Sequence, residues 1–136
     1  MLDPMDFRGK VVLVTGGGKG VGRGISQRFL DCGAEVVICG REAPPTLPAS
    51  GGREALFVPC DVTDTAALAA AIDAVRQRFG PVSVLLNNAA NDRRHEMADV
   101  TSDDFDRLVA VNIKHQFFAA QAVADDMRAL GGGSII

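Results

Sequence analysis

The fold is decided by residues 11–22, which read VVLVTGGGKGVG. The first four of these residues are apolar, as in a strand that is buried on both faces. The glycines that follow would interrupt a helix, but apolar residues then recur at helical spacing, at Val21, Ile25 and Phe29. The stretch therefore predicts a strand, a glycine-rich turn and a helix, with Gly33 as the C-terminal cap of that helix.

The same alternation continues along the chain. Short apolar runs predict four more strands, and amphipathic stretches predict two more helices. The strands cover residues 36–39, 56–58, 82–86 and 134–136, the helices cover 64–79 and about 101–130, and surface loops cover 43–52 and 91–99. Strands and helices that alternate in this way favour right-handed crossovers and a parallel sheet. The predicted fold class is α/β, a doubly wound parallel sheet with helices on both faces, formed by one domain.

Composition excludes several classes of function. The chain has 136 residues, 47% of them hydrophobic and 23% charged, and a net charge of -3, so it has the composition of a soluble globular domain without a basic surface for nucleic acid. No apolar run is long enough to span a membrane, and the N-terminus does not resemble a secretory signal. The three cysteines lack metal-binding or redox spacing, which favours free thiols in the cytoplasm.

The glycine-rich turn is a candidate phosphate-binding loop. Backbone N–H groups and the helix dipole favour an anion at a helix N-terminus, and close approach needs residues without a side chain. The alternative is a structural turn that binds nothing, and the absence of Gly-Lys-Ser/Thr disfavours an ATPase loop. The candidate cofactor-binding residues here are Thr15, Gly16, Gly17, Gly18, Lys19, Gly20, Val21 and Gly22.

Several motifs in a fixed order carry a family resemblance. The spacing Thr-Gly-x-x-x-Gly-x-Gly resembles the cofactor motif of short-chain dehydrogenases/reductases. The motifs that follow in that family's order are Asp61-Val62, Asn87-Asn88-Ala89-Ala90, Val111-Asn112-Ile113 and the closing Gly-Gly-Ser-Ile-Ile. The resemblance covers residues 7–136 and implies a Rossmann-type fold and a nicotinamide cofactor. Residues 91–95, Asn-Asp-Arg-Arg-His, together with residues 114–118, Lys-His-Gln-Phe-Phe, are similar to bacterial sugar dehydrogenases of this family.

The resemblance also implies roles for residues that follow the later strands. Asp61 and Val62 are expected to border the adenine of the cofactor. Asn88, Ala89 and Ala90 are expected to line the nucleotide near the nicotinamide ribose. The family usually has glycine where Ala90 stands, so a methyl group there could narrow the site.

The end of the second strand bears on the choice between NADP and NAD. A carboxylate at this position accepts hydrogen bonds from the ribose of NAD, but here Gly40 stands at the expected acidic position and Arg41 follows it. Arg41 and Lys19 would attract the extra phosphate of NADP. The alternative is that both are solvated surface cations, and Glu42 weakens the local positive field. The pattern favours NADP, with NAD possible.

Asn112 is the only catalytic candidate within the chain. Phe105, Leu108, Val109 and Asn112 share a helical stripe that should face the sheet, where a buried amide needs a specific partner. That partner could be an internal hydrogen bond to a neighbouring strand. The resemblance instead implies that Asn112 holds a water in a proton relay.

The resemblance implies further catalytic groups, a tyrosine, a lysine and a serine, C-terminal to residue 136. The chain contains no tyrosine. We therefore expect it to supply the cofactor-binding half of an oxidoreductase, cut at the fifth strand and inactive by itself. The alternative is that the natural protein ends at residue 136.

The expected reaction is hydride transfer between the cofactor and a carbonyl or alcohol substrate, and the polar loop 91–95 suits a sugar. By analogy with the family we expect a homodimer or homotetramer, and no nucleic acid, membrane or metal partner. His95 and His115 are predicted to be surface or packing residues. The alternatives are a non-catalytic dinucleotide-binding module or pseudoenzyme, an NAD-dependent sugar dehydrogenase, and an interaction protein whose glycine loop is only structural.

Overall fold

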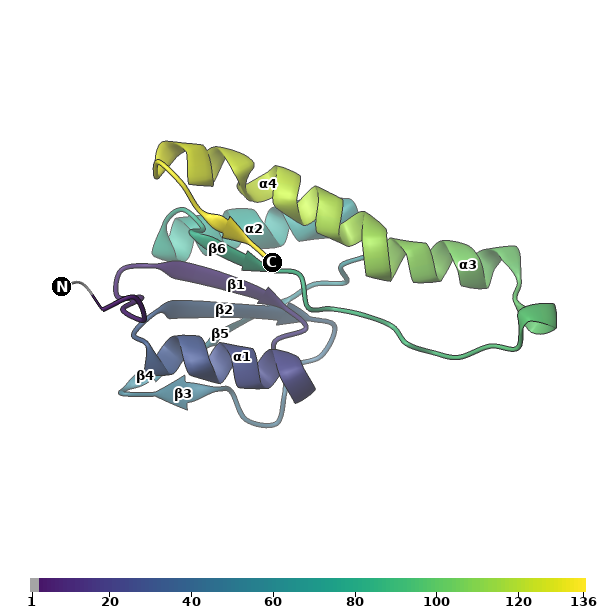
Figure 1. The fold of residues 1–136 in the computed structure, drawn as a ribbon, viewed down its shortest axis with the longest axis horizontal. Coiled ribbons are helices and arrows are strands. Elements are labelled where there is room, and N and C mark those ends of the chain that lie inside the picture. Colours follow the sequence, from purple (N-terminus) through teal and green to yellow (C-terminus); the bar gives the residue numbers. More distant parts are fainter. Residues whose placement is uncertain (1–2) are drawn as a thin grey trace.

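The centre of the molecule is a five-stranded parallel sheet. The computed structural model describes residues 3–136, and its strands lie in the order β5-β2-β1-β6-β7 (Figure 1). The strands are β1 (Val11–Thr15), β2 (Glu35–Gly40), β5 (Leu56–Pro59), β6 (Val84–Leu86) and β7 (Ser134–Ile135). Both β2 and β6 pair with β1, so successive crossovers run outward in opposite directions from the centre. The predicted doubly wound α/β fold is confirmed.

Helices cover both faces of this sheet. Helix α1 (Gly20–Asp31) lies on one face, and α2 (Thr65–Phe79) and α4 (His115–Ala129) lie on the other (Figure 1). The alternating side chains of β1 divide the core accordingly. Val12 and Val14 belong to the cluster that includes Leu30 of α1, whereas Val11 and Leu13 belong to the cluster with the buried residues of α2 and α4.

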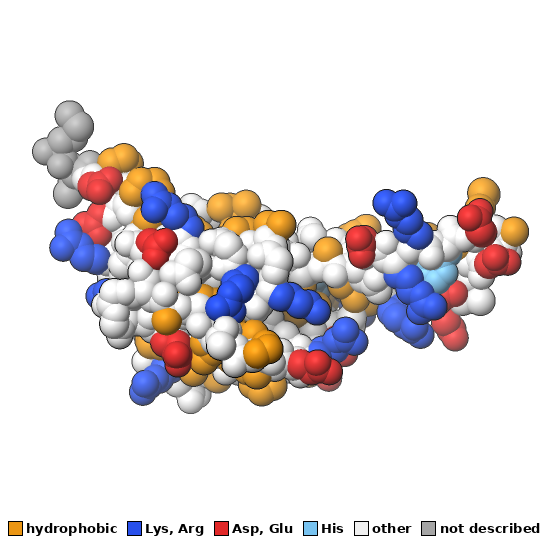
Figure 2. Space-filling model, turned by 90° about the horizontal axis from the view of Figure 1, so that it is seen from below, with side chains coloured by type: hydrophobic (Ala, Val, Ile, Leu, Met, Phe, Trp, Pro, Cys, Tyr) orange, Lys and Arg blue, Asp and Glu red, His pale blue; other side chains and the backbone are white. Residues whose placement is uncertain are grey.

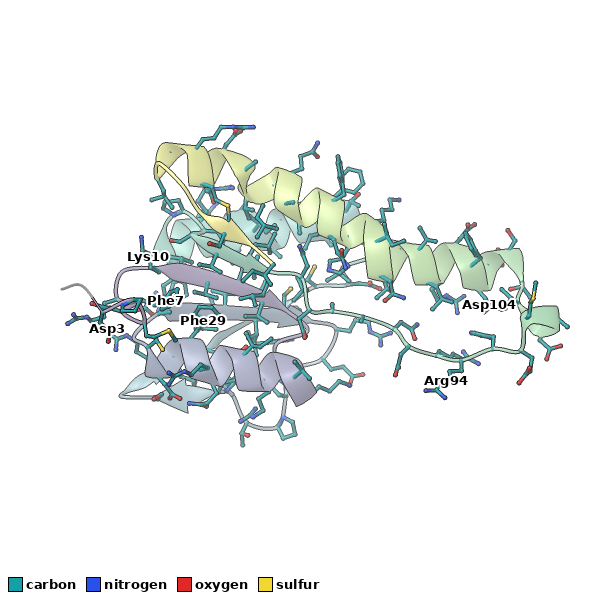
Figure 3. The ribbon with its side chains drawn as sticks, viewed as in Figure 1. Asp3, Phe7, Lys10, Phe29, Arg94 and Asp104 are labelled. Carbon is teal, nitrogen blue, oxygen red and sulfur yellow. The ribbon has the colours of Figure 1, made fainter. Side chains whose placement is uncertain are left out.

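The N-terminal segment docks beside the end of α1. The backbone N–H of Phe7 donates to the carbonyl of Cys32, and the Phe7 ring packs edge-on against Phe29 with ring centroids 4.9 Å apart (Figure 3). Gly33 follows in the left-handed region (φ 90°), as predicted for a C-terminal cap.

The predicted helix over residues 101–130 contains three consecutive parts. Helix α3 (Ser102–Val109) passes into a π-helical turn, η2 (Ala110–Lys114), which leads into α4. Helix α3 begins with a capping box, which the Thr-x-x-Asp spacing of residues 101–104 indicates: the Thr101 hydroxyl accepts the N–H of Asp104 and the Asp104 carboxylate accepts the N–H of Thr101. A short 3-10 turn, η1 (Met97–Asp99), precedes it. None of the helices in residues 3–136 combines the length and the apolar character needed to cross a membrane.

The prediction that residues 43–52 form only a loop is wrong for residues 49–52. Two short antiparallel strands, β3 (Ala49–Ser50) and β4 (Arg53–Glu54), form a hairpin there. The two-residue turn between them consists of Gly51 and Gly52, both with positive φ, which is the geometry that tight hairpins require. Such short strands carry no period-2 apolar pattern, so the sequence gives no strand signal.

A buried carboxylate joins the two helices on one face of the sheet. Asp126 of α4 accepts a hydrogen bond from Nε of Arg76 in α2 at 2.7 Å and another from the backbone N–H of Val82 at 3.0 Å. The Asp126 side chain is 8% exposed. One side chain therefore fixes α4 to α2 and to the segment that enters β6.

Replacing Asp126 by alanine should destabilise the fold. Both hydrogen bonds to the charged group are lost, so the free energy of unfolding should fall by about 1.5–3 kcal/mol in urea denaturation. The neighbouring Asp125 is the control, because its side chain is 90% exposed and pairs only with Arg128. Asp125→Ala should change the free energy of unfolding by no more than about 0.5 kcal/mol. Equal effects of the two substitutions would contradict this role for Asp126.

Candidate functional site

A cleft lies at the carboxyl ends of the central strands. It has a volume of about 1040 Å³ and occupies the point where the crossovers diverge from β1 toward β2 and toward β6. Ligands of doubly wound sheets bind at this topological switch point. The cleft is lined by residues of the glycine-rich loop, of the ends of β2 and β5 and of the loop after β6, including Gly16, Gly18, Lys19, Val21, Gly22, Arg41, Asp61, Val62, Asn88, Ala89 and Ala90.

The glycines between β1 and α1 are required by close contacts. A Cβ on Gly22 would lie 2.2 Å from the carbonyl oxygen of Gly16 and 2.4 Å from Nδ2 of Asn88. A Cβ on Gly17 would lie 2.5 Å from the side chain of Ile38. Gly16 also has a φ of 65°, in the left-handed region. The glycine-rich loop therefore packs closely against the neighbouring strands on one side, and its other side faces the cleft.

The first turn of α1 has free backbone donors. Asp64 caps α2 and Thr101 caps α3 through their side chains, whereas no side chain within residues 3–136 caps α1 at its N-cap residue Lys19. The first N–H groups of a helix have no partner inside the helix. The donors of α1 therefore remain available beside Gly18 and Val21, which both line the cleft.

Thr15 and Asn88 join the ends of β1 and β6. The buried hydroxyl Oγ1 of Thr15 accepts the backbone N–H groups of Asn88 at 3.0 Å and Ala89 at 2.9 Å. In return, Nδ2 of Asn88 donates to the carbonyl oxygens of Thr15 and Gly16. We call these four hydrogen bonds the Thr15–Asn88 clamp. It holds two walls of the cleft together.

Charges of both signs lie at the end of β2. Arg41 and Lys19 line the cleft together with Glu42 and Asp61. Hydrogen bonds from the N–H and hydroxyl of Thr63, with a smaller effect of the Arg41 charge, lower the pKa of Asp61. Asp61 is therefore ionised at neutral pH, and the charge of Arg41 is close enough to stabilise its ionised form. The cation predicted to select NADP shares the cleft with the carboxylates of Glu42, Asp61 and Asp92.

These observations describe a cleft at the switch point of the sheet, and comparison with known proteins gives the family. The chain matches the short chain dehydrogenase family over residues 10–136. It belongs to the short-chain dehydrogenases.

Relatives of this family match nearly the whole length of the chain. A Rhizobium meliloti protein named "Probable galactose dehydrogenase GalD" is 39% identical over 96% of this chain and 54% of its own length. D-xylose 1-dehydrogenase of Caulobacter vibrioides is 37% identical over 96% of this chain and 53% of its own length. A crystal structure of a Sinorhizobium meliloti protein assigned to the short-chain alcohol dehydrogenases has a TM-score of 0.86 at 30% identity, over 98% of this chain and 55% of that chain. The similarity to bacterial sugar dehydrogenases is confirmed, and the chain spans about half the length of the curated relatives it matches.

Most of the predicted cofactor residues line the cleft of this short-chain dehydrogenase. The exceptions are Thr15, Gly17 and Gly20. Thr15 is fully buried and holds the loop after β6, Gly17 is packed under Ile38, and Gly20 has a φ of 54° at the start of α1. These three residues shape the loop, and direct contact between any of them and a cofactor stays a prediction.

The prediction that Phe105, Leu108, Val109 and Asn112 face the sheet is wrong. Phe105 is 62% exposed, and no residue of α3 is buried. Helix α3 runs beyond the ends of the strands, where no sheet lies beneath it (Figure 1). The π-helical turn at Ala110–Lys114 also interrupts the 3.6-residue spacing on which the stripe was based.

Asn112 lies in the middle of that π-helical turn. Its Oδ1 accepts the backbone N–H of Asn91 at 2.8 Å, and its Nδ2 donates to the carbonyl of Asn91 at 2.9 Å. Both ends of the amide are therefore engaged by one residue of the loop after β6. Asn112 positions that loop, and its role in a proton relay stays a prediction.

The charged loop after the cleft extends away from it. Asn91 and Asp92 line the cleft, but Arg93, Arg94 and His95 do not. Arg94 lies on the part of the loop that runs alongside α3 (Figure 3). Side chains of both charge signs gather on this extension of the molecule (Figure 2).

The sequence did not indicate where three of the buried side chains lie relative to the site. Cys39 and Cys60 are buried thiols, and both line the cleft. His115 is a fully buried packing residue, one of the two roles predicted for it, but its contact with Thr15 was missed. Its burial could have been assigned because His115, Ala119, Val123 and Met127 form a stripe at four-residue spacing.

Substitution of Thr15 tests the clamp. Thr15→Val keeps the shape of the side chain but leaves the N–H groups of Asn88 and Ala89 without an acceptor. The free energy of unfolding should fall by about 1–3 kcal/mol in urea denaturation. Thr15→Ser keeps the hydroxyl and should lose no more than about 1 kcal/mol, the value of one methyl group. If serine were as destabilising as valine, the hydroxyl would not be the acceptor that holds the loop.

Proposed function

We propose that residues 1–136 are the dinucleotide-binding domain of an NAD(P)-dependent oxidoreductase. The cleft between β1, β2 and β6 would hold the cofactor, with its diphosphate against the free N–H groups of α1. The observation that carries the proposal is the cradle formed by Gly16 and Gly22. A side chain on Gly22 would collide with the carbonyl of Gly16 and with Asn88 of the clamp, and a side chain on Gly16 would crowd Asn88 and Ala89. Family membership supports a nicotinamide cofactor, NAD or NADP.

The residues present fit such a cofactor. The cleft volume is at the upper end of the range for small-molecule and cofactor pockets. The uncapped helix N-terminus suits a diphosphate, and Asp61 and Val62 form the wall expected to border the adenine. When bound, the nicotinamide would accept a hydride from an alcohol substrate or give one to a carbonyl substrate.

NADP is the favoured cofactor in this proposal. Gly40 provides no carboxylate at the end of β2, and Arg41 and Lys19 offer two cations to the extra phosphate. Glu42 and Asp61 oppose this preference, so NAD stays the alternative.

The substrate in this proposal is a small carbonyl or alcohol, with a sugar favoured. The names of the galactose and xylose dehydrogenases among the relatives support a sugar. We also propose a cytoplasmic homodimer or homotetramer. All three cysteines are free thiols, and Phe105, Ile113 and Phe117 are exposed along the long helix, where another subunit could cover them.

Titration of the chain with NADPH and NADH, followed by nicotinamide fluorescence, tests the main proposal. Saturable binding is expected, and Gly22→Ala should raise the dissociation constant about tenfold or more by displacing the loop. Gly24→Ala is the matched control on the same helix, because no atom lies within 4 Å of its added Cβ. Binding that is absent in the folded chain, or equal in the two variants, would contradict the proposal.

The cofactor preference has its own test. Arg41→Ala should raise the dissociation constant of NADPH about tenfold and leave that of NADH nearly unchanged, because only NADPH carries the phosphate that Arg41 would contact. Arg28→Ala, an exposed arginine outside the cleft, should change neither value. An equal loss for both cofactors would show that Arg41 does not distinguish them.

A further inference from the structure

His115 is a buried titratable side chain that the proposed function does not use. It lies where η2 passes into α4, and its ring is fully buried against the end of β1. Nδ1 contacts the carbonyl oxygen of Val111 in η2, and Nε2 lies 3.4 Å from Oγ1 of Thr15. The ring therefore bridges the helix to the Thr15–Asn88 clamp.

The hydrogen-bond partners fix the tautomer of the ring. A carbonyl can only accept, so Nδ1 must carry the proton that it donates to Val111. In a neutral imidazole Nε2 is then an acceptor. Oγ1 of Thr15 already accepts the N–H groups of Asn88 and Ala89, and its own proton is free to be donated to Nε2 or to the carbonyl of Leu86, each at 3.4 Å.

The surroundings of the ring keep it neutral. Burial lowers the pKa of His115, although the hydrogen bond to Val111 partly opposes this effect, and no charged side chain among residues 3–136 contributes to the shift. A second proton on Nε2 would also face a hydroxyl oxygen that is already accepting two N–H groups. The acceptor on Nε2 is therefore present at neutral pH.

The ring connects the two ends of one segment of the cleft wall. Thr15 holds the start of the segment, at Asn88 and Ala89, and Asn112 in η2 holds its end, at Asn91. We propose that His115 is a positioning residue. Its neutral ring couples η2 to the Thr15 hydroxyl and so holds residues 88–91 in place as part of the cleft wall. The effect of His115 on cofactor binding rests on the proposed function, whereas its effect on the position of residues 88–91 does not.

The experiment compares His115→Phe with His115→Gln in the whole chain. Phenylalanine fills the space without a nitrogen, whereas the glutamine side chain can place an acceptor near the position of Nε2. Hydrogen exchange followed by NMR should show the Asn88 and Ala89 amides about tenfold less protected in His115→Phe, with protection largely restored in His115→Gln. His95→Phe, on the extended loop, is the control and should leave these amides unchanged.

Two further measurements distinguish a failure of the role proposed for His115 from a failure of the proposed function. The ring nitrogen shifts of His115 should report a neutral ring protonated at Nδ1 at pH 7, with no ligand present. NADPH should bind about tenfold more weakly to His115→Phe than to the unsubstituted chain. Unchanged amide protection in His115→Phe, or a ring protonated at Nε2, overturns the role of His115. Reduced protection in a chain that binds no dinucleotide upholds that role and counts against the proposed function instead.

Discussion

The architecture of the site depends on one hydroxyl group. Oγ1 of Thr15 accepts two backbone N–H groups from the loop after β6, and Asn88 returns two hydrogen bonds to the loop after β1. Parallel strands alone align β1 and β6 but do not determine how the chain leaves their ends. The clamp determines it, and the glycine loop can then lie flat because Gly16 and Gly22 have no side chains.

The clamp also explains why polar groups accumulate at this edge. The carboxyl ends of parallel strands lie at the same edge of the sheet, and each connection that leaves this edge must satisfy its own backbone groups. Thr15, Asn88 and Asn112 do so with side chains, whereas the first turn of α1 has no side-chain cap among residues 3–136. This helix N-terminus faces the cleft at the switch point of the sheet, which is the physical basis for assigning an anionic ligand to it.

Much of this arrangement could be predicted from the sequence. The apolar run before the glycines, the cap at Gly33 and the capping box at Thr101 act locally, so their signals lie within a few residues. The failures have a different origin. The exposure of Phe105 depends on how far α3 extends beyond the sheet and on a π-helical turn, and neither leaves a periodic signal. The contact between His115 and Thr15 joins residues 100 positions apart, so sequence spacing cannot reveal it.

The central claim is that the edge of the sheet held by the clamp binds the diphosphate of a dinucleotide. The most direct measurement is a map of backbone amide shifts in the ¹⁵N-labelled chain as NADPH is added. Saturable shifts are expected at residues 16–22 and 88–91, with little change near Arg8 and Gly33, where the opposite end of the sheet lies. Shifts confined to that opposite end, or an unchanged spectrum of the folded chain at saturating NADPH, would contradict it.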